Sequence, residues 1–139
     1  MGDPPGAVTF RTPAEAYAGE MIILRRFWDA AVALDPAAAA RDEGRSMPYC
    51  TPDELAGLWT SSGLADVRVS PVVVAAGYDD FEDLWQPLEL GVAPSGAYAT
   101  ALPAARRLAL KAELHRRLGV GDGPFRLTAR AWVATGRVP

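Results

Sequence analysis

Hydrophobic residues recur at helical spacing in several parts of this chain and alternate with polar residues in others. Over residues 19–34, apolar side chains return every three or four positions, which predicts a helix that ends at Asp35-Pro36. Over residues 103–118, leucines stack at i, i+4 and i+8, which predicts a second helix opened by Pro103. Residues 37–48 mix alanines with charged side chains and are interpreted as either a frayed helix or a solvated loop.

Two shorter helices are predicted by the residues at their ends. Thr51-Pro52-Asp53-Glu54 has the form of a capping box, and Gly63 suits the left-handed position that closes such a helix. Asp79-Asp80 can cap a short helix that begins near Phe81, and Pro87 is expected to limit it. Residues 88–100 are predicted to form a loop, because glycine, proline and serine interrupt the pattern there.

Three segments have the composition and alternation of β-strands, namely residues 7–10, 67–75 and 125–133. Pro71 lacks an amide hydrogen, so its strand is expected at a sheet edge or with a bulge at that point. The order of strand, helices, strand, helices, strand is typical of the end of an α/β protein. Three strands offer little area for so many helices to cover.

Composition places the chain among folded proteins. Its 139 residues are 50% hydrophobic and 22% charged, which fits one domain with a buried core. The net charge of -3 argues against nucleic acid as a partner, and no apolar run reaches the roughly 20 residues of a membrane-spanning helix. Cys50 is the only cysteine, which excludes an internal disulfide and a cysteine-based zinc cluster. A cytoplasmic location follows as the default.

Four segments carry a resemblance to a known family. They are Phe-Trp-Asp-Ala-Ala at residues 27–31, Leu-Trp-x-x-x-Gly-Leu-x-Asp-Val-x-Val at 58–69, the acidic and aromatic residues 80–87, and Leu-Thr-Ala-Arg-Ala-Trp at 127–132. In this order and spacing they resemble the C-terminal half of class I S-adenosylmethionine-dependent methyltransferases of the methyltransferase-domain-11 type. None of the four is a catalytic signature, and together they extend over nearly the whole chain.

The resemblance implies an α/β fold that is part of a Rossmann-like methyltransferase sheet. In that family the last three strands lie side by side as fifth, seventh and sixth. Residues 7–10 would be the fifth strand, residues 67–75 the sixth and residues 125–133 the seventh, between them. The helices of residues 19–34 and 79–118 would be insertions that form a lid over the acceptor substrate, above the carboxyl ends of the strands. Residues 12–18 look longer and less regular than the family's usual connection.

The family holds its cofactor with a glycine-rich turn after the first strand and an acidic residue at the end of the second. Those strands would precede Met1, so the resemblance assigns no cofactor-binding or catalytic residue to this chain. We therefore expect a single domain without the cofactor-binding half, which contributes a substrate lid and oligomer contacts and does not catalyse methyl transfer alone. A homodimer is expected, either through an open strand edge around Val8 or by exchange of lid helices.

Several residues of catalytic types have simpler explanations. The glycine-rich residues 119–123 follow a helix and precede a strand, which is the reverse of a cofactor loop, so Gly119 is interpreted as a helix C-cap. His115 is the only histidine and is expected on a solvated helix face. The acidic residues 79–83 suit the first turn of a helix better than a metal site. Cys50 has no histidine placed to activate it and is expected to be inert.

The aromatic side chains of the predicted lid are the best candidates for contact with a ligand, because small-molecule sites are mostly apolar with few polar groups. Plain core packing explains them equally well. Trp59 and Trp132 belong to elements that pack on the sheet and are expected in the core. The predicted substrate-binding residues are Trp28, Tyr49, Phe81, Trp85 and Tyr98.

Three functions remain open at this point. The first is the C-terminal lid and oligomerisation region of a small-molecule methyltransferase. The second is a stand-alone, non-catalytic module that binds a small apolar ligand or a partner protein. The third is a complete enzyme of unrelated chemistry, which the lack of a catalytic triad or a metal-ligand set disfavours.

Overall fold

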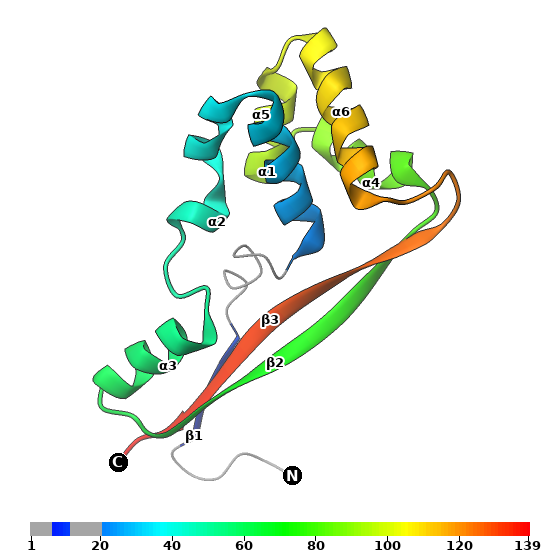
Figure 1. The fold of residues 1–139 in the computed structure, drawn as a ribbon. Helices are drawn as coiled ribbons and strands as arrows, with labels where there is room; N and C mark the ends of the chain where they lie inside the picture. Colours follow the sequence, from blue (N-terminus) through cyan, green and yellow to red (C-terminus); the bar gives the residue numbers. More distant parts are fainter. Residues whose placement is uncertain (1–6, 12–20) are drawn as a thin grey trace.

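The computed structural model describes residues 7–11 and 21–139, which form a mixed α/β fold with an antiparallel sheet and a group of helices (Figure 1). The strands are β1 (Ala7–Arg11), β2 (Ala65–Tyr78) and β3 (Phe125–Arg137). Their order is β1-β3-β2, and both neighbours of β3 run antiparallel to it. The last strand therefore lies between the other two.

The sheet is three strands wide over only a short part of its length. Strand β1 pairs with residues 133–137 of β3, whereas β2 pairs with β3 along nearly its whole length. Beyond Trp132 the two long strands continue as a two-stranded ribbon to Tyr78 and Phe125, whose rings stack at 5.2 Å. A two-stranded ribbon is only marginally stable by itself. This ribbon therefore depends on packing against helices.

The helices gather in two places. Figure 1 shows α1, α4, α5 and α6 on one side of the ribbon, while α3 lies near the end where the sheet has three strands. The expected helix start near Gly19 and the connection of residues 12–18 lie outside the described part of the chain. The elements are α1 (Ile22–Leu34), the 3-10 helix η2 (Pro36–Arg41), α2 (Glu43–Ser46), α3 (Pro52–Ser61), α4 (Phe81–Glu89), α5 (Ala93–Ala101) and α6 (Ala104–Leu118).

Several of the predicted helix ends are confirmed in detail. The Thr51 hydroxyl accepts a hydrogen bond from the Glu54 amide at 3.3 Å and caps α3, whose far end is closed by Gly63 at φ +89°. The Asp80 carboxylate caps α4, and Gly119 adopts the left-handed conformation at the end of α6. The predicted edge position of Pro71 is also confirmed, because β2 is an outer strand.

The prediction of a loop over residues 88–100 was wrong, because helix α5 occupies most of it. Pro94 stands in the first turn of α5, where the missing amide costs no hydrogen bond. A Cβ atom on Gly96 would come within 2.6 Å of the Gly91 carbonyl carbon, so this glycine permits a close backbone contact. Pro87 lies inside α4 and does not end it.

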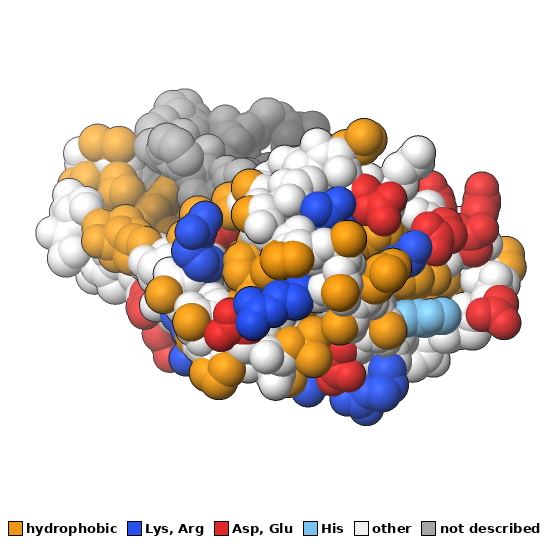
Figure 2. All heavy atoms as spheres, turned by 90° about the horizontal axis from the view of Figure 1, so that it is seen from above, with side chains coloured by type: hydrophobic (Ala, Val, Ile, Leu, Met, Phe, Trp, Pro, Cys, Tyr) orange, Lys and Arg blue, Asp and Glu red, His pale blue; other side chains and the backbone are white. Residues whose placement is uncertain are grey.

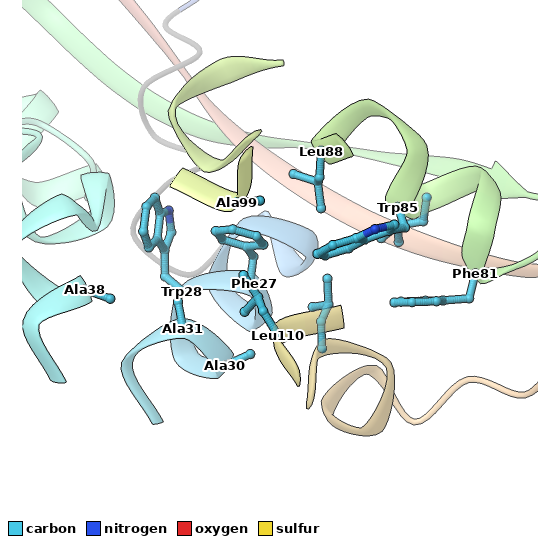
Figure 3. Packing of buried hydrophobic residues seen from close by; sticks show 12 residues of the cluster. Phe27, Trp28, Ala30, Ala31, Ala38, Phe81, Trp85, Leu88, Ala99 and Leu110 are labelled. Atoms are coloured by element: carbon cyan, nitrogen blue, oxygen red, sulfur yellow. The ribbon is translucent and has the colours of Figure 1, made fainter. Parts of the chain in front are cut away.

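The apolar side chains form two separate clusters. In the smaller cluster, Leu55 and Trp59 of α3 pack on Ala134 of β3, with Trp132 beside them. Trp59 is therefore a core residue, as predicted. The larger cluster, called the helical core below, joins α1, α4, α5 and α6 (Figure 3) and includes Phe27, Trp28, Ala30, Ala31, Ala38, Phe81, Leu84, Trp85, Leu88, Ala99, Leu110 and Leu114.

Two glycines in helices provide a matched test of this packing. We expect Gly96→Ala to lower the free energy of unfolding by about 1–3 kcal/mol, because the added methyl group meets backbone that cannot move freely. Gly57→Ala in α3 meets no atom within 4 Å and should raise it by about 0.5–1 kcal/mol. Urea unfolding followed by circular dichroism measures both. Equal effects of the two substitutions would contradict the close contact at Gly96.

Candidate functional site

The structure places the five predicted substrate-binding residues in two settings. Trp28 of α1 and Phe81 and Trp85 of α4 are buried in the helical core, and Tyr98 of α5 packs against that core while half-buried. Tyr49 stands in the turn before α3, is 44% exposed and does not belong to the helical core. Four of the five residues therefore share one helical layer, and Tyr49 lies apart from it.

The buried aromatic rings form two contacting groups. Trp28 lies 5.4 Å from Tyr98 and 5.1 Å from Phe27, measured between ring centroids. Phe81 and Trp85 stack at 6.4 Å on the other side of the core. Figure 3 shows the Phe27 ring between the Trp28 ring and the Trp85 ring. This packing holds the helices together, and Tyr98 is the predicted residue that also lines the opening between α1, α5 and α6.

That opening is a cavity of about 140 Å³ between α1, α5 and α6. An apolar cavity of about 150 Å³ is large enough to take up benzene, whereas drug-sized ligands occupy roughly 300 Å³ or more. The cavity thus fits one aromatic ring or a short alkyl chain. Its walls are mostly apolar and carry three polar side chains, and the lining residues are Ala31, Leu34, Asp35, Tyr98, Leu102, Arg106, Ala109 and Leu110.

The three polar side chains give the cavity hydrogen-bonding capacity. Burial raises the pKa of the Tyr98 phenol, and the Asp35 carboxylate raises it further, while Arg106 acts in the opposite direction. The phenol therefore stays protonated at neutral pH and can donate a hydrogen bond. Arg106 adds a charged donor, and Asp35 adds an acceptor that also caps η2 by accepting from the Ala37 amide at 3.0 Å. A small apolar molecule with one polar group matches this arrangement.

A buried ion pair fixes the segment that follows Asp35. The Asp42 side chain is fully buried, and it accepts hydrogen bonds from Arg25 Nη2 at 2.6 Å and from the Gly44 amide at 3.0 Å. The hydrogen bond to Asp42 raises the pKa of the Arg25 guanidinium, against the lowering effect of burial. Arg45 lies 3.4 Å from the same carboxylate. This pair ties the segment between η2 and α2 to α1.

Sequence reasoning found Tyr98 but not the other polar side chains of the cavity. Asp35 was interpreted only as the end of a helix, and Arg106 carried no signal that distinguished it from other surface arginines. Residues 37–48 were expected to be solvated or frayed, yet Asp42 within them is buried. Because these residues come from separate elements, no local spacing could have brought them together.

A second, more open cleft of about 430 Å³ lies beside α4 and α6. In Figure 2, acidic side chains gather near the single histidine on this face. The expectation that His115 is solvated was wrong in part. Its ring stacks on Phe81 at 4.3 Å, and its Nε2 atom is buried without a hydrogen-bond partner among the described residues. Lys111 Nζ lies 2.5 Å from Glu82 Oε1 at the same cleft.

Other candidates of catalytic type have structural roles. Cys50 is buried, with its Sγ 3.4 Å from the Met47 carbonyl oxygen. Among the described residues, no group of three or more histidine, cysteine, aspartate or glutamate side chains could hold a metal ion. Gly119 ends α6, so the glycine-rich residues 119–123 follow a helix and lead into β3, as the sequence order predicted.

Comparison with known proteins adds no assignment, since no family model and no curated protein matches this chain. Within residues 7–11 and 21–139, no helix has both the length and the apolar character that crossing a membrane requires.

Two neighbouring arginines of α1 test the buried ion pair. We expect Arg25→Ala to lower the free energy of unfolding by about 3 kcal/mol, because Asp42 then stays buried without its main partner. Arg26→Ala removes an exposed side chain 3.9 Å from Asp29 and should change it by less than about 0.5 kcal/mol. Urea unfolding compares the two variants, and similar losses would contradict the importance of the Arg25–Asp42 pair.

Proposed function

We propose that this chain is the substrate-lid region of an S-adenosylmethionine-dependent small-molecule methyltransferase and that its cavity holds a small apolar acceptor. Two features support the proposal. The last strand lies between the other two, which is the order that the sequence resemblance implies for the end of a methyltransferase sheet. The intervening helices stand where lid insertions are expected, α1 between β1 and β2 and α4 to α6 between β2 and β3.

One observation carries the proposal, namely that the two expected lid insertions enclose a cavity together. The first insertion and its end contribute Ala31, Leu34 and Asp35. The second insertion contributes Tyr98 from α5, Leu102 from the connection, and Arg106, Ala109 and Leu110 from α6. The cavity exists only because segments far apart in the sequence pack side by side. Its apolar walls and few polar groups are typical of small-molecule sites.

The chemistry available to these residues is positioning. Methyl transfer is an in-line displacement, so an acceptor must be held at a fixed angle and distance from the methyl donor. Apolar walls from Ala31, Leu102 and Leu110 would hold the acceptor and exclude water. The Tyr98 phenol and Arg106 can donate to a polar group on it, and Asp35 can accept. The described residues include no cofactor cradle, so no step with the methyl donor is derived from them.

A second candidate function rests on the same cavity. A stand-alone module that binds a small apolar ligand needs the walls and the polar side chains but no methyl donor. The two functions differ in whether S-adenosylmethionine takes part.

Calorimetric titrations with S-adenosylmethionine and with phenol test the two parts of the proposal, namely that the cofactor site lies outside these residues and that the acceptor cavity lies within them. We expect no saturable binding of S-adenosylmethionine by this chain, because residues 119–123 follow α6 and lead into β3, the reverse of a loop that opens a helix toward its ligand. Phenol, titrated in the same way, should bind in the cavity. Saturable binding of S-adenosylmethionine would overturn the view that the cofactor site lies outside these residues.

Blocking the mouth of the cavity tests the site itself. Ala109 lines the cavity and is exposed, so Ala109→Trp should fill its entrance without disturbing the helical core. We expect this variant to weaken phenol binding at least about tenfold, as followed by amide shifts in NMR spectra. Ala112→Trp is the matched control, because Ala112 is exposed on the same helix and lines the other cleft. Equal weakening in both variants would count against the cavity.

A further inference from the structure

The outer edge of β2 is the feature of this molecule most suited to contact with another protein. Within the described residues β2 pairs with β3 alone, and in Figure 1 no helix lies along its other edge. The side chains of Val72, Val73 and Val74 are 41%, 57% and 59% exposed. Successive side chains of a strand point to opposite faces, so both faces of β2 are exposed at this point.

The composition of this edge favours pairing with another strand. Residues 72–77 read Val-Val-Val-Ala-Ala-Gly and contain no charge. Proteins usually protect outer strands with charged side chains, prolines, bulges or short length. In β2 the irregular pairing between Ala65 and Arg68 and the proline at position 71 both lie on one side of this run. The run itself has none of these protections and presents unpaired backbone amides and carbonyls.

We infer that β2 pairs antiparallel with β2 of a second copy of this chain, about a two-fold axis at Val74. In this register Val74 faces Val74 and Val73 faces Ala75. The same register brings Arg68 of each copy toward Asp79 and Asp80 of the other, which follow the end of β2 directly, at both ends of the apolar run. Opposite charges that approach each other in this way attract. An axis at Val72 would place Arg68 opposite Ala76 and lose both charge pairs.

The choice of a second copy follows from this self-complementarity. A two-fold axis makes each contact occur twice and closes the assembly at two chains. The function expected from the sequence gives this chain a role in oligomer contacts, and the inference names the outer edge of β2 as the surface that makes them. It does not depend on which ligand the cavity holds. It moves the contact from the first strand and the lid helices, where the sequence analysis placed it, to the edge of β2.

Sedimentation velocity over a range of protein concentrations tests the dimer. We expect the unmodified chain to dimerise and Val74→Lys to weaken the dimer at least about tenfold, because two like charges then face each other at the axis. Leu90→Lys is the control, since Leu90 is 74% exposed on α4's end and should leave association unchanged. A monomer at high concentration, or a dimer that Val74→Lys leaves intact, would overturn the inference.

A crosslink tests the register independently of stability. Directly opposed residues in antiparallel strands have Cα atoms about 4.5–5.5 Å apart, a distance that a disulfide spans. With oxidised glutathione, Val74→Cys should form a disulfide-linked dimer, while Leu90→Cys should not. Cys50 is buried and gives no such product in the unmodified chain. Absence of the Val74→Cys crosslink overturns the proposed axis, and neither result alters the S-adenosylmethionine or phenol titrations.

Discussion

The apolar contact between α1 and the helices that follow β2 is the interaction on which the rest of this structure depends. Phe27 has no exposed surface, and around it pack side chains from α4, α5 and α6. Burial of large apolar side chains of this kind contributes roughly 1.5–3 kcal/mol each. The contact also anchors the far end of the ribbon, because Tyr78 and Phe125 pack against the same core. Without it neither the cavity nor the long strands would have a fixed position.

The cavity is a consequence of how small and large side chains alternate in this layer. Ala31 and Ala109 line the opening with small side chains, while Trp28 and Leu110 beside them are buried. Protein interiors are close-packed, so an opening of this size beside a well-packed core is a specific feature of the shape. The Arg25–Asp42 pair adds directional contacts that tie the segment after Asp35 back to α1.

Local features of this fold could be predicted from the sequence, and features that join distant segments could not. The caps at Thr51, Gly63 and Asp80 depend on neighbouring residues, and the structure confirms them. Helix α5 was missed because Gly96 was interpreted as a breaker, although it serves a close backbone contact that no local pattern reveals. The burial of Asp42 depends on Arg25, seventeen positions away. Tyr98 was found as an aromatic side chain, not as a wall of a cavity.

The separation of the two apolar clusters has a consequence for how the molecule opens. Helix α3 and its few buried contacts lie at one end of the ribbon, and the helical core lies at the other. Segments with few buried contacts open at a lower free energy than those in a large core. Backbone amides of α3 should therefore exchange with solvent deuterium well before those of α1 and α6. Strand β3 contributes residues to both clusters. Local unfolding at one end of the ribbon would therefore affect packing at the other end through β3.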